Sequence, residues 1–190
     1  MKRTAHPSWL VLAAFVLAQA PAAAQARQPG TTTVILVRHA EKAAEPAADP
    51  PLSAAGEARA KALVDVARDA GVTAVVTTQF LRTRATAQPL ASALGITPEV
   101  VDARAAQHAQ QVARTVLGRH AGEVVLVAGH SNTIPAIIAA LGAKQPPDIC
   151  DSEYDGLYVV TVPPQGAAHV IRARYGAATP AEAGCAGMMK

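Results

Sequence analysis

Short apolar segments rich in β-branched residues alternate with alanine-rich segments of helical length along most of the chain. This alternation indicates βα units, whose strands pair in parallel and whose helices cover the sheet. Two final apolar segments, separated by a short turn with proline and glycine, predict an antiparallel hairpin. We therefore expect an α/β three-layer sandwich: a mostly parallel sheet with an antiparallel edge and helices on both faces. The expected strands cover 32–37, 74–78, 98–102, 123–129, 157–162 and 169–175, and the expected helices cover 54–70, 82–94, 105–117 and 133–141.

The first thirty residues differ in character from the rest. Lys2 and Arg3 precede the apolar run WLVLAAFVLAQA, and the small residues of PAAAQA follow it. A basic start, an apolar run too short to span a bilayer comfortably and a small-residue site are typical of a cleaved secretory signal. We expect a signal peptide over 1–24, cleaved after residue 24 or 26, one domain over 30–176 and a C-terminal tail over 177–190. We therefore expect a periplasmic or secreted protein without stable membrane insertion. The alternative is that the N-terminal segment stays uncleaved and anchors the protein to the membrane.

Charge and cysteine content narrow the classes of partner. Removal of the signal leaves 15 basic residues against 14 acidic ones, and only 3% of the residues are aromatic. A nearly neutral chain with few aromatic side chains lacks the basic surface and the stacking groups of a nucleic-acid-binding protein, so we expect no nucleic acid partner.

Cys150 and Cys185 either pair in an oxidising compartment or stay independent thiols, and the sequence leaves both open.

Histidine and arginine side chains follow three of the expected strands. Arg38 and His39 come directly after the first strand, Arg82 lies shortly after the second, and His130 follows the fourth. Ligands of open α/β sheets bind at the carboxyl ends of the strands, so these side chains can share one edge. Arginine presents a fork of donors that matches phosphate oxygens, and a neutral histidine can attack phosphorus and hold the phosphoryl group covalently. The combination predicts a phosphoryl-transfer site for a small phosphoester.

A metal site fits the same edge less well. Metal ions require clustered histidine, aspartate or glutamate ligands, and adjacent arginines would repel the cation. We therefore expect neither a metal ion nor a cofactor.

Four segments together resemble the histidine phosphatase superfamily, in its phosphoglycerate-mutase-like branch: LVRHAEK, LSAAGEARAKAL, TTQFLRTRATAQPLA and VVLVAGHSNTIPAII. RHA is similar to the family's Arg-His-Gly signature, with Ala40 in the place of glycine. The resemblance implies that His39 is the nucleophile and becomes phosphorylated. It also implies that Arg38 and Arg82 bind the phosphoryl oxygens and that His130 stabilises the transferring group. The expected function is a metal-independent phosphomonoester hydrolase with a phosphohistidine intermediate, acting on a periplasmic phosphorylated small molecule or envelope component.

The chain departs from the family after the third expected strand. Many members carry a glutamate general acid there, whereas this chain reads DARAAQHAQQ. Glu153 and Asp155 precede a strand that would run antiparallel, so they would start at the same edge and are candidates to protonate the leaving oxygen. Arg82 is preferred to Arg84 because its spacing to the Thr-Ala pair at 86–87 matches the family.

Two other functions fit parts of the sequence. GHSNT is similar to the hydrolase elbow G-x-S-x-G, with Ser131 as nucleophile and Asp151 or Asp155 and His169 following in the order of a triad. That interpretation leaves the arginines unexplained, and Thr133 stands in the place of the last glycine. The other alternative is a catalytically weak phosphoester-binding protein that kept the pocket and lost the acid.

Overall fold

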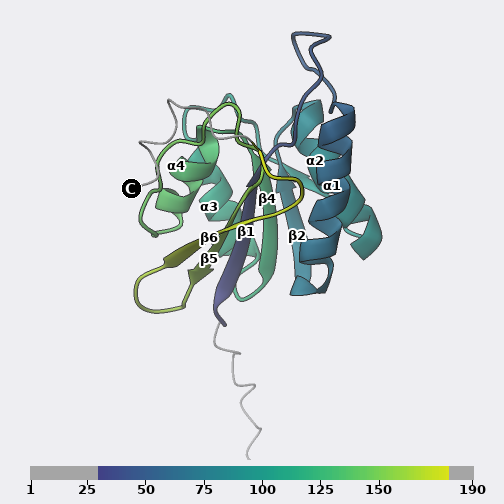
Figure 1. Ribbon diagram of the computed structural model, residues 1–190. Helices are drawn as coiled ribbons and strands as arrows, with labels where there is room; N and C mark the ends of the chain where they lie inside the picture. Colours follow the sequence, from purple (N-terminus) through teal and green to yellow (C-terminus); the bar gives the residue numbers. More distant parts are fainter. Residues whose placement is uncertain (1–29, 180–190) are drawn as a thin grey trace, which may run out of the picture.

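The computed structural model describes residues 30–179, which form a six-stranded sheet with helices on both faces (Figure 1). The strands are β1 (Thr32–Arg38), β2 (Val72–Thr77), β3 (Glu99–Val100), β4 (Val124–Gly129), β5 (Gly156–Val162) and β6 (His169–Arg174). The helices are α1 (Ala54–Ala67), the short 3-10 turn η1 (Arg68–Ala70), α2 (Leu81–Leu94), α3 (His108–Arg119) and α4 (Thr133–Ala140).

The strand order is β3-β2-β4-β1-β5-β6, and the pairings from β3 to β1 are all parallel. β5 pairs antiparallel with β1, and β6 pairs antiparallel with β5. The predicted fold class is therefore confirmed. β1 lies inside the sheet between β4 and β5, so the residues after it are fixed on both sides by paired backbone.

The two faces of β1 bury different helices. Val34 and Leu36 pack in one core with α3 and α4, and Ile35 and Val37 pack in the other with α1 and α2. Successive side chains of a strand point to opposite faces, so a run of apolar residues suits a strand covered on both sides. Figure 1 shows α1 and α2 together on one side of the sheet and α3 and α4 on the other.

Several element ends agree with the sequence and others differ by up to three residues. Ser53 caps α1, because its Oγ accepts a hydrogen bond from the Gly56 amide at 3.2 Å. α2 continues through Pro89. α3 begins at His108 rather than 105, since residues 102–105 form a turn in which the Arg104 amide donates to Asp102 Oδ1. It also continues through Gly118, where the sequence predicted its end.

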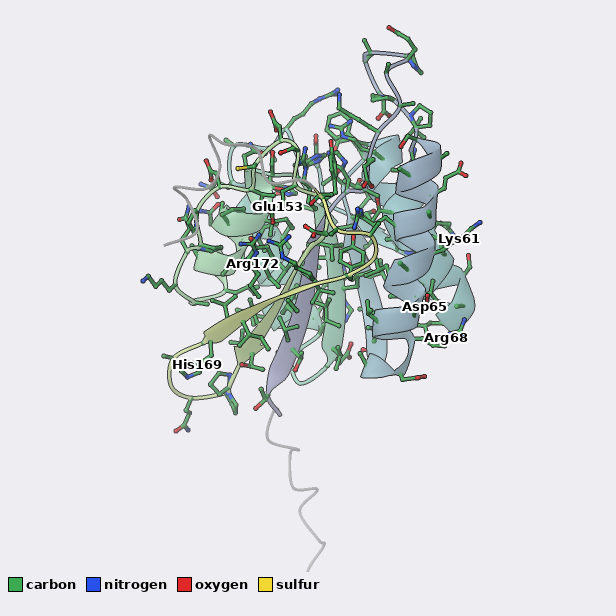
Figure 2. The ribbon with its side chains drawn as sticks, in the orientation of Figure 1. Lys61, Asp65, Arg68, Glu153, His169 and Arg172 are labelled. Atoms are coloured by element: carbon green, nitrogen blue, oxygen red, sulfur yellow. The ribbon has the colours of Figure 1, made fainter. Side chains whose placement is uncertain are left out.

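The predictions for the two chain ends lie outside the described residues. The predicted signal peptide falls within residues 1–29, and Cys185 and most of the predicted tail fall within residues 180–190. Within the described part, no helix combines the length and the apolar character that crossing a bilayer requires. Lys61 and Asp65 of α1 and Arg68 of η1 are exposed and turned away from the sheet (Figure 2).

Candidate active site

The register of β1 and β4 brings the two predicted histidines together. Arg38 at the end of β1 pairs with Gly129 at the end of β4, so the next residues, His39 and His130, are neighbours across the parallel pair. The His39 amide also donates to the Gly129 carbonyl at 2.8 Å. The two imidazole ring centroids are 5.3 Å apart. Two short strands thus bring together side chains that are distant in sequence.

A pocket of about 660 Å³ opens over these histidines at the carboxyl ends of the strands. Ligand pockets of proteins commonly occupy some 300–1,000 Å³, so this one holds more than a phosphoryl group. Its charged and aromatic lining residues are Arg38, His39, Lys42, Phe80, Arg82, Arg104, His130, Asp151 and Tyr154. All four residues predicted to act on the phosphoryl group therefore line a single pocket.

His39 is held in one tautomer. Its Nδ1 lies 2.8 Å from the carbonyl oxygen of Ala40, and because a carbonyl only accepts, Nδ1 carries the proton. In the neutral ring, Nε2 then keeps its lone pair. The side chain is only 5% exposed, and burial, helped by the nearby guanidinium groups of Arg38 and Arg82, lowers the pKa of His39 to about 4. His39 is consequently neutral at pH 7, as the predicted nucleophile needs to be.

Ala40 packs where the family signature has glycine. It is fully buried in a small cluster with Leu52 and Ala60, and its amide donates to Thr86 Oγ1 at 2.9 Å. The methyl group therefore fits the site. Through Thr86, helix α2 fixes the backbone beside His39.

His130 is also neutral. Its Nε2 lies 3.2 Å from the Thr78 hydroxyl, which in turn lies 2.8 Å from the Thr83 hydroxyl. The ring of Phe80 packs edge-on against the imidazole, at 5.4 Å between centroids. Burial, together with the nearby His39 and Arg82, lowers the pKa of His130 to about 3. The imidazole ring of His130 is thus held in place and is uncharged at pH 7.

Arg38 is locked by the segment that precedes β5. Its Nη1 donates to the carbonyl oxygens of Cys150, Asp151 and Glu153 at 2.7, 2.9 and 2.9 Å. The guanidinium carbon lies 4.1 Å from the ring centroid of Tyr154, a cation–π distance. The Nε atom is buried and has no acceptor among the described residues. Arg38 is thus rigid, with donor capacity left for a ligand.

Arg82 approaches the pocket from the first turn of α2. One nitrogen lies 3.5 Å from Asp49, which also accepts from the Leu81 amide at the start of that helix. The guanidinium carbon lies 4.3 Å from the Phe80 ring centroid. Arg84 is exposed and does not line the pocket, so the structure places Arg82, the residue preferred from the sequence, at the site.

Residues 34–105, from β1 into the turn before α3, match the family model of the histidine phosphatase superfamily (branch 1). Over these residues the chain is similar to this superfamily. The matched segment contains Arg38, His39 and Arg82 and ends before His130. No curated protein matches this chain.

Solved structures share the fold of this chain. The protein histidine phosphatase SixA complexed with tungstate aligns with a TM-score of 0.59 at 15% identity, covering 75% of this chain and 96% of SixA. YhfR of Bacillus stearothermophilus aligns with a TM-score of 0.54 at 19% identity, covering 68% of this chain and 90% of YhfR. Mycobacterial glucosyl-3-phosphoglycerate phosphatase aligns with a TM-score of 0.53 at 14% identity, covering 78% of this chain and 100% of that enzyme. At such identities the likeness establishes the fold alone.

The two general-acid candidates do not line the pocket. Both lie at the predicted edge, but each pairs with an arginine of β6: Glu153 with Arg172 (Figure 2), and Asp155 with Arg174 at 2.7 Å. Burial alone would raise the pKa of Asp155, but hydrogen bonds from Thr179 and Arg174 outweigh it and leave the pKa below its ordinary value. Neither acid is among the residues that line the pocket, and both are held by ion pairs, so the role of general acid stays a prediction for them.

The serine-hydrolase alternative also fails on geometry. His169 opens β6 and pairs with Thr161, which in turn pairs with Thr33 near the start of β1. Ser131 follows the opposite, carboxyl end of β4. Figure 2 shows His169 at the far end of the hairpin from Glu153, which lies at the same edge as the pocket. Ser131 and His169 therefore cannot form a triad.

Sequence reasoning did not assign five of the charged or aromatic lining residues to the phosphoryl site: Lys42, Phe80, Arg104, Asp151 and Tyr154. Arg104 had the clearest signal, because it follows β3 and so obeys the same strand-end rule that identified Arg38 and His130. It stands in the segment where many family members carry a glutamate. Among residues 30–179, no group of three or more histidine, cysteine, aspartate or glutamate side chains is placed to hold a metal ion.

Proposed function

We propose that this chain is a metal-independent phosphomonoester hydrolase that works through a phosphohistidine intermediate, on a phosphorylated small molecule or envelope component in the periplasm. The observation that carries the proposal is the pair of buried, neutral histidines with ring centroids 5.3 Å apart, in one pocket with Arg38 and Arg82. Loss of turnover in a His39→Ala variant tests it, as developed in the Discussion.

In the first step, Nε2 of His39 attacks phosphorus, an N–P bond forms and the bond to the leaving oxygen breaks. Arg38, Arg82 and His130 hold the remaining oxygens, where charge redistributes in the transition state. Buried Nε atoms of both arginines have no acceptor among the described residues. Because a buried donor without an acceptor is costly, a phosphoryl group that supplies acceptors would bind favourably.

In the second step, water attacks phosphorus, the N–P bond breaks, and inorganic phosphate leaves. His39 returns to its neutral form with Nδ1–H still donated to Ala40. The backbone contact thus sets the same tautomer at the start and the end of each cycle.

The pocket favours substrates whose leaving group needs little protonation. Asp151 is the one carboxylate among its lining residues, and its side chain is 96% exposed and 3.7 Å from Arg38. The lining residues therefore include no buried carboxyl group beside the position of the leaving oxygen. This favours phosphoramidates, acyl phosphates or aryl phosphates over alkyl phosphates; SixA, which shares the fold, is a protein histidine phosphatase. Turnover of p-nitrophenyl phosphate would distinguish a phosphatase, whatever its natural substrate, from a protein that binds phosphoesters without hydrolysing them.

We expect the acid limb of kcat/KM near pH 4. His39 attacks only when neutral, and its pKa of about 4 keeps it neutral at all higher pH values. An exposed histidine, with its pKa near 6.5, would lose activity already below pH 6.5. The measurement is a pH profile corrected for the separately titrated ionisation of the substrate. A midpoint near 6.5 after that correction would contradict the neutral-nucleophile mechanism.

Turnover should survive prolonged dialysis against EDTA. The proposed mechanism supplies positive charge from arginine side chains, which a chelator does not remove. The rate on p-nitrophenyl phosphate should stay within about twofold, a change of less than 0.5 kcal/mol in the barrier. Inactivation that one divalent metal reverses would show that the proposed mechanism is incomplete.

We propose export with cleavage near residue 24 or 26, on the basis of the N-terminal sequence alone. Expressed with its full N-terminus in a Gram-negative host, the protein should appear in the periplasmic fraction with Gln25 or Arg27 as its first residue. N-terminal sequencing checks this. Recovery of an intact Met1 in the membrane fraction would support the anchor instead.

A further inference from the structure

Two of the four cations in the pocket lining have no carboxylate partner in the described part of the chain. Arg38 lies 3.7 Å from the Asp151 carboxylate, and Arg82 lies 3.5 Å from that of Asp49. Within residues 30–179, no carboxylate lies within ion-pair distance of Arg104 or Lys42, although both line the pocket. Like charges in a partly enclosed cleft reinforce one another's attraction for an anion. The pocket therefore has more positive charge than a phosphoryl group held by Arg38 and Arg82 uses.

Arg104 is placed by three restraints. Its own amide donates to Asp102 Oδ1 at 2.9 Å, and the amide before it, on Ala103, donates to Gln79 Oε1 at 2.9 Å. The guanidinium carbon lies 5.2 Å from the Phe80 ring centroid, within cation–π range. The backbone turn and the aromatic ring thus limit the conformations of a side chain that would otherwise be free in solvent.

Phe80 also fixes where Arg104 lies relative to the chemistry. The same ring contacts the guanidinium of Arg82, at 4.3 Å, and packs edge-on against His130. Arg104 therefore stands beside the residues proposed to hold the phosphoryl group, one aromatic ring away. The pocket volume of about 660 Å³ leaves room there for the remainder of a substrate.

We propose that Arg104, assisted by Lys42, binds a second anionic group of the substrate, a carboxylate or a second phosphate, while Arg38 and Arg82 bind the phosphoryl group that is transferred. The preferred substrates are accordingly phosphorylated compounds with two separate anionic groups. This inference deepens the proposed function and rests on it for the identity of the transferred group.

The test uses binding of analogues that cannot be hydrolysed, so that it does not depend on turnover. Isothermal titration of the purified protein compares phosphonoacetate, phosphonopropionate and phosphonobutyrate with alkylphosphonates of matched chain length. The flexible chains sample a range of distances between the two anionic groups. Methylenediphosphonate and ethylenediphosphonate form a second arm, which distinguishes a phosphate from a carboxylate as the second group.

We expect at least one doubly anionic analogue to bind about tenfold or more tightly than its matched alkylphosphonate, the effect of a charge-assisted hydrogen bond. Arg104→Gln should bring that ratio close to one, and Arg104→Lys should keep part of it. Arg84→Gln removes an exposed arginine outside the pocket and should keep the wild-type ratio. The wild-type rate on p-nitrophenyl phosphate is measured in parallel.

Two results would overturn the proposal. One is a wild-type protein that binds both classes of analogue equally. The other is an Arg104→Gln variant that weakens both classes by the same factor, which would mean that Arg104 holds the transferred phosphoryl group itself. A protein that prefers doubly anionic analogues but hydrolyses no phosphoester would refute the proposed phosphatase activity and leave the second anion site standing.

Discussion

The His39→Ala variant is expected to lose about 10⁴- to 10⁶-fold in kcat, because removal of a covalent nucleophile leaves only the binding groups. The methyl side chain cannot form the N–P bond, and nothing on the neighbouring backbone replaces it. His39 follows β1, whose side chains before it are buried in the two cores, so the substitution should leave the fold intact. Circular dichroism and thermal melting check the fold, and p-nitrophenyl phosphate gives the rate.

His169→Ala is the matched control. His169 is an exposed histidine at the opposite end of the sheet, so this variant should keep the wild-type rate. Rapid quenching of the wild-type reaction at alkaline pH, followed by mass spectrometry, should detect acid-labile phosphate on the peptide that contains His39. A folded His39→Ala variant that keeps more than about a tenth of the wild-type rate would refute the phosphohistidine mechanism, because the rate would then have fallen by less than about tenfold.

Gly56→Ala is expected to destabilise the protein by about 2–4 kcal/mol, at the upper end of what an added methyl group costs in a packed site. Gly56 lies in the first turn of α1 and touches the backbone just beyond the nucleophile. A Cβ built there would lie 2.1 Å from the Glu41 carbonyl oxygen. That oxygen also accepts from the Ser53 amide at 2.9 Å, so it has little freedom to move. Turnover should fall as well, because the displaced segment adjoins His39.

Gly118→Ala is the opposite case within the same chain. Gly118 lies inside α3, and a Cβ there would meet no atom within 4 Å. Alanine in a helix interior is favoured over glycine by about 0.5–1 kcal/mol, so this variant should be more stable than the wild type. Urea unfolding of both variants measures the two free energies. If both substitutions changed the free energy of unfolding by the same small amount, α1 would not pack closely on the segment after β1.

The sequence predicted the residues that depend on strand order better than those that depend on side-chain direction. The adjacency of His39 and His130 follows from parallel pairing of β1 with β4, and alternating βα units predict that pairing. Glu153 and Asp155 were placed at the correct edge, but their direction depends on the register of the β5–β6 hairpin, which composition does not specify.

Other differences have similarly local causes. A glycine ends a helix only where the chain turns left-handed, and after α3 that turn occurs at Gly122, with φ of 81°, rather than at Gly118. Arg104 and Tyr154 stand in connecting segments whose paths are set by tertiary contacts, such as the three carbonyls around Arg38. Periodicity in the sequence has no information on such contacts.

The position of β1 has a consequence for how the chain folds. This strand is the first of the sheet in sequence, yet Thr33 pairs with Val124 on one side and with Thr161 on the other. Closing such long loops costs chain entropy before any pairing energy returns, so proteins with this topology fold slowly. The carbonyls that accept from Arg38 lie 112 to 115 residues downstream. A chain that ends before residue 150 would leave β1 with an open edge and this guanidinium without these acceptors, so assembly of the pocket must await the segment before β5 and the last hairpin.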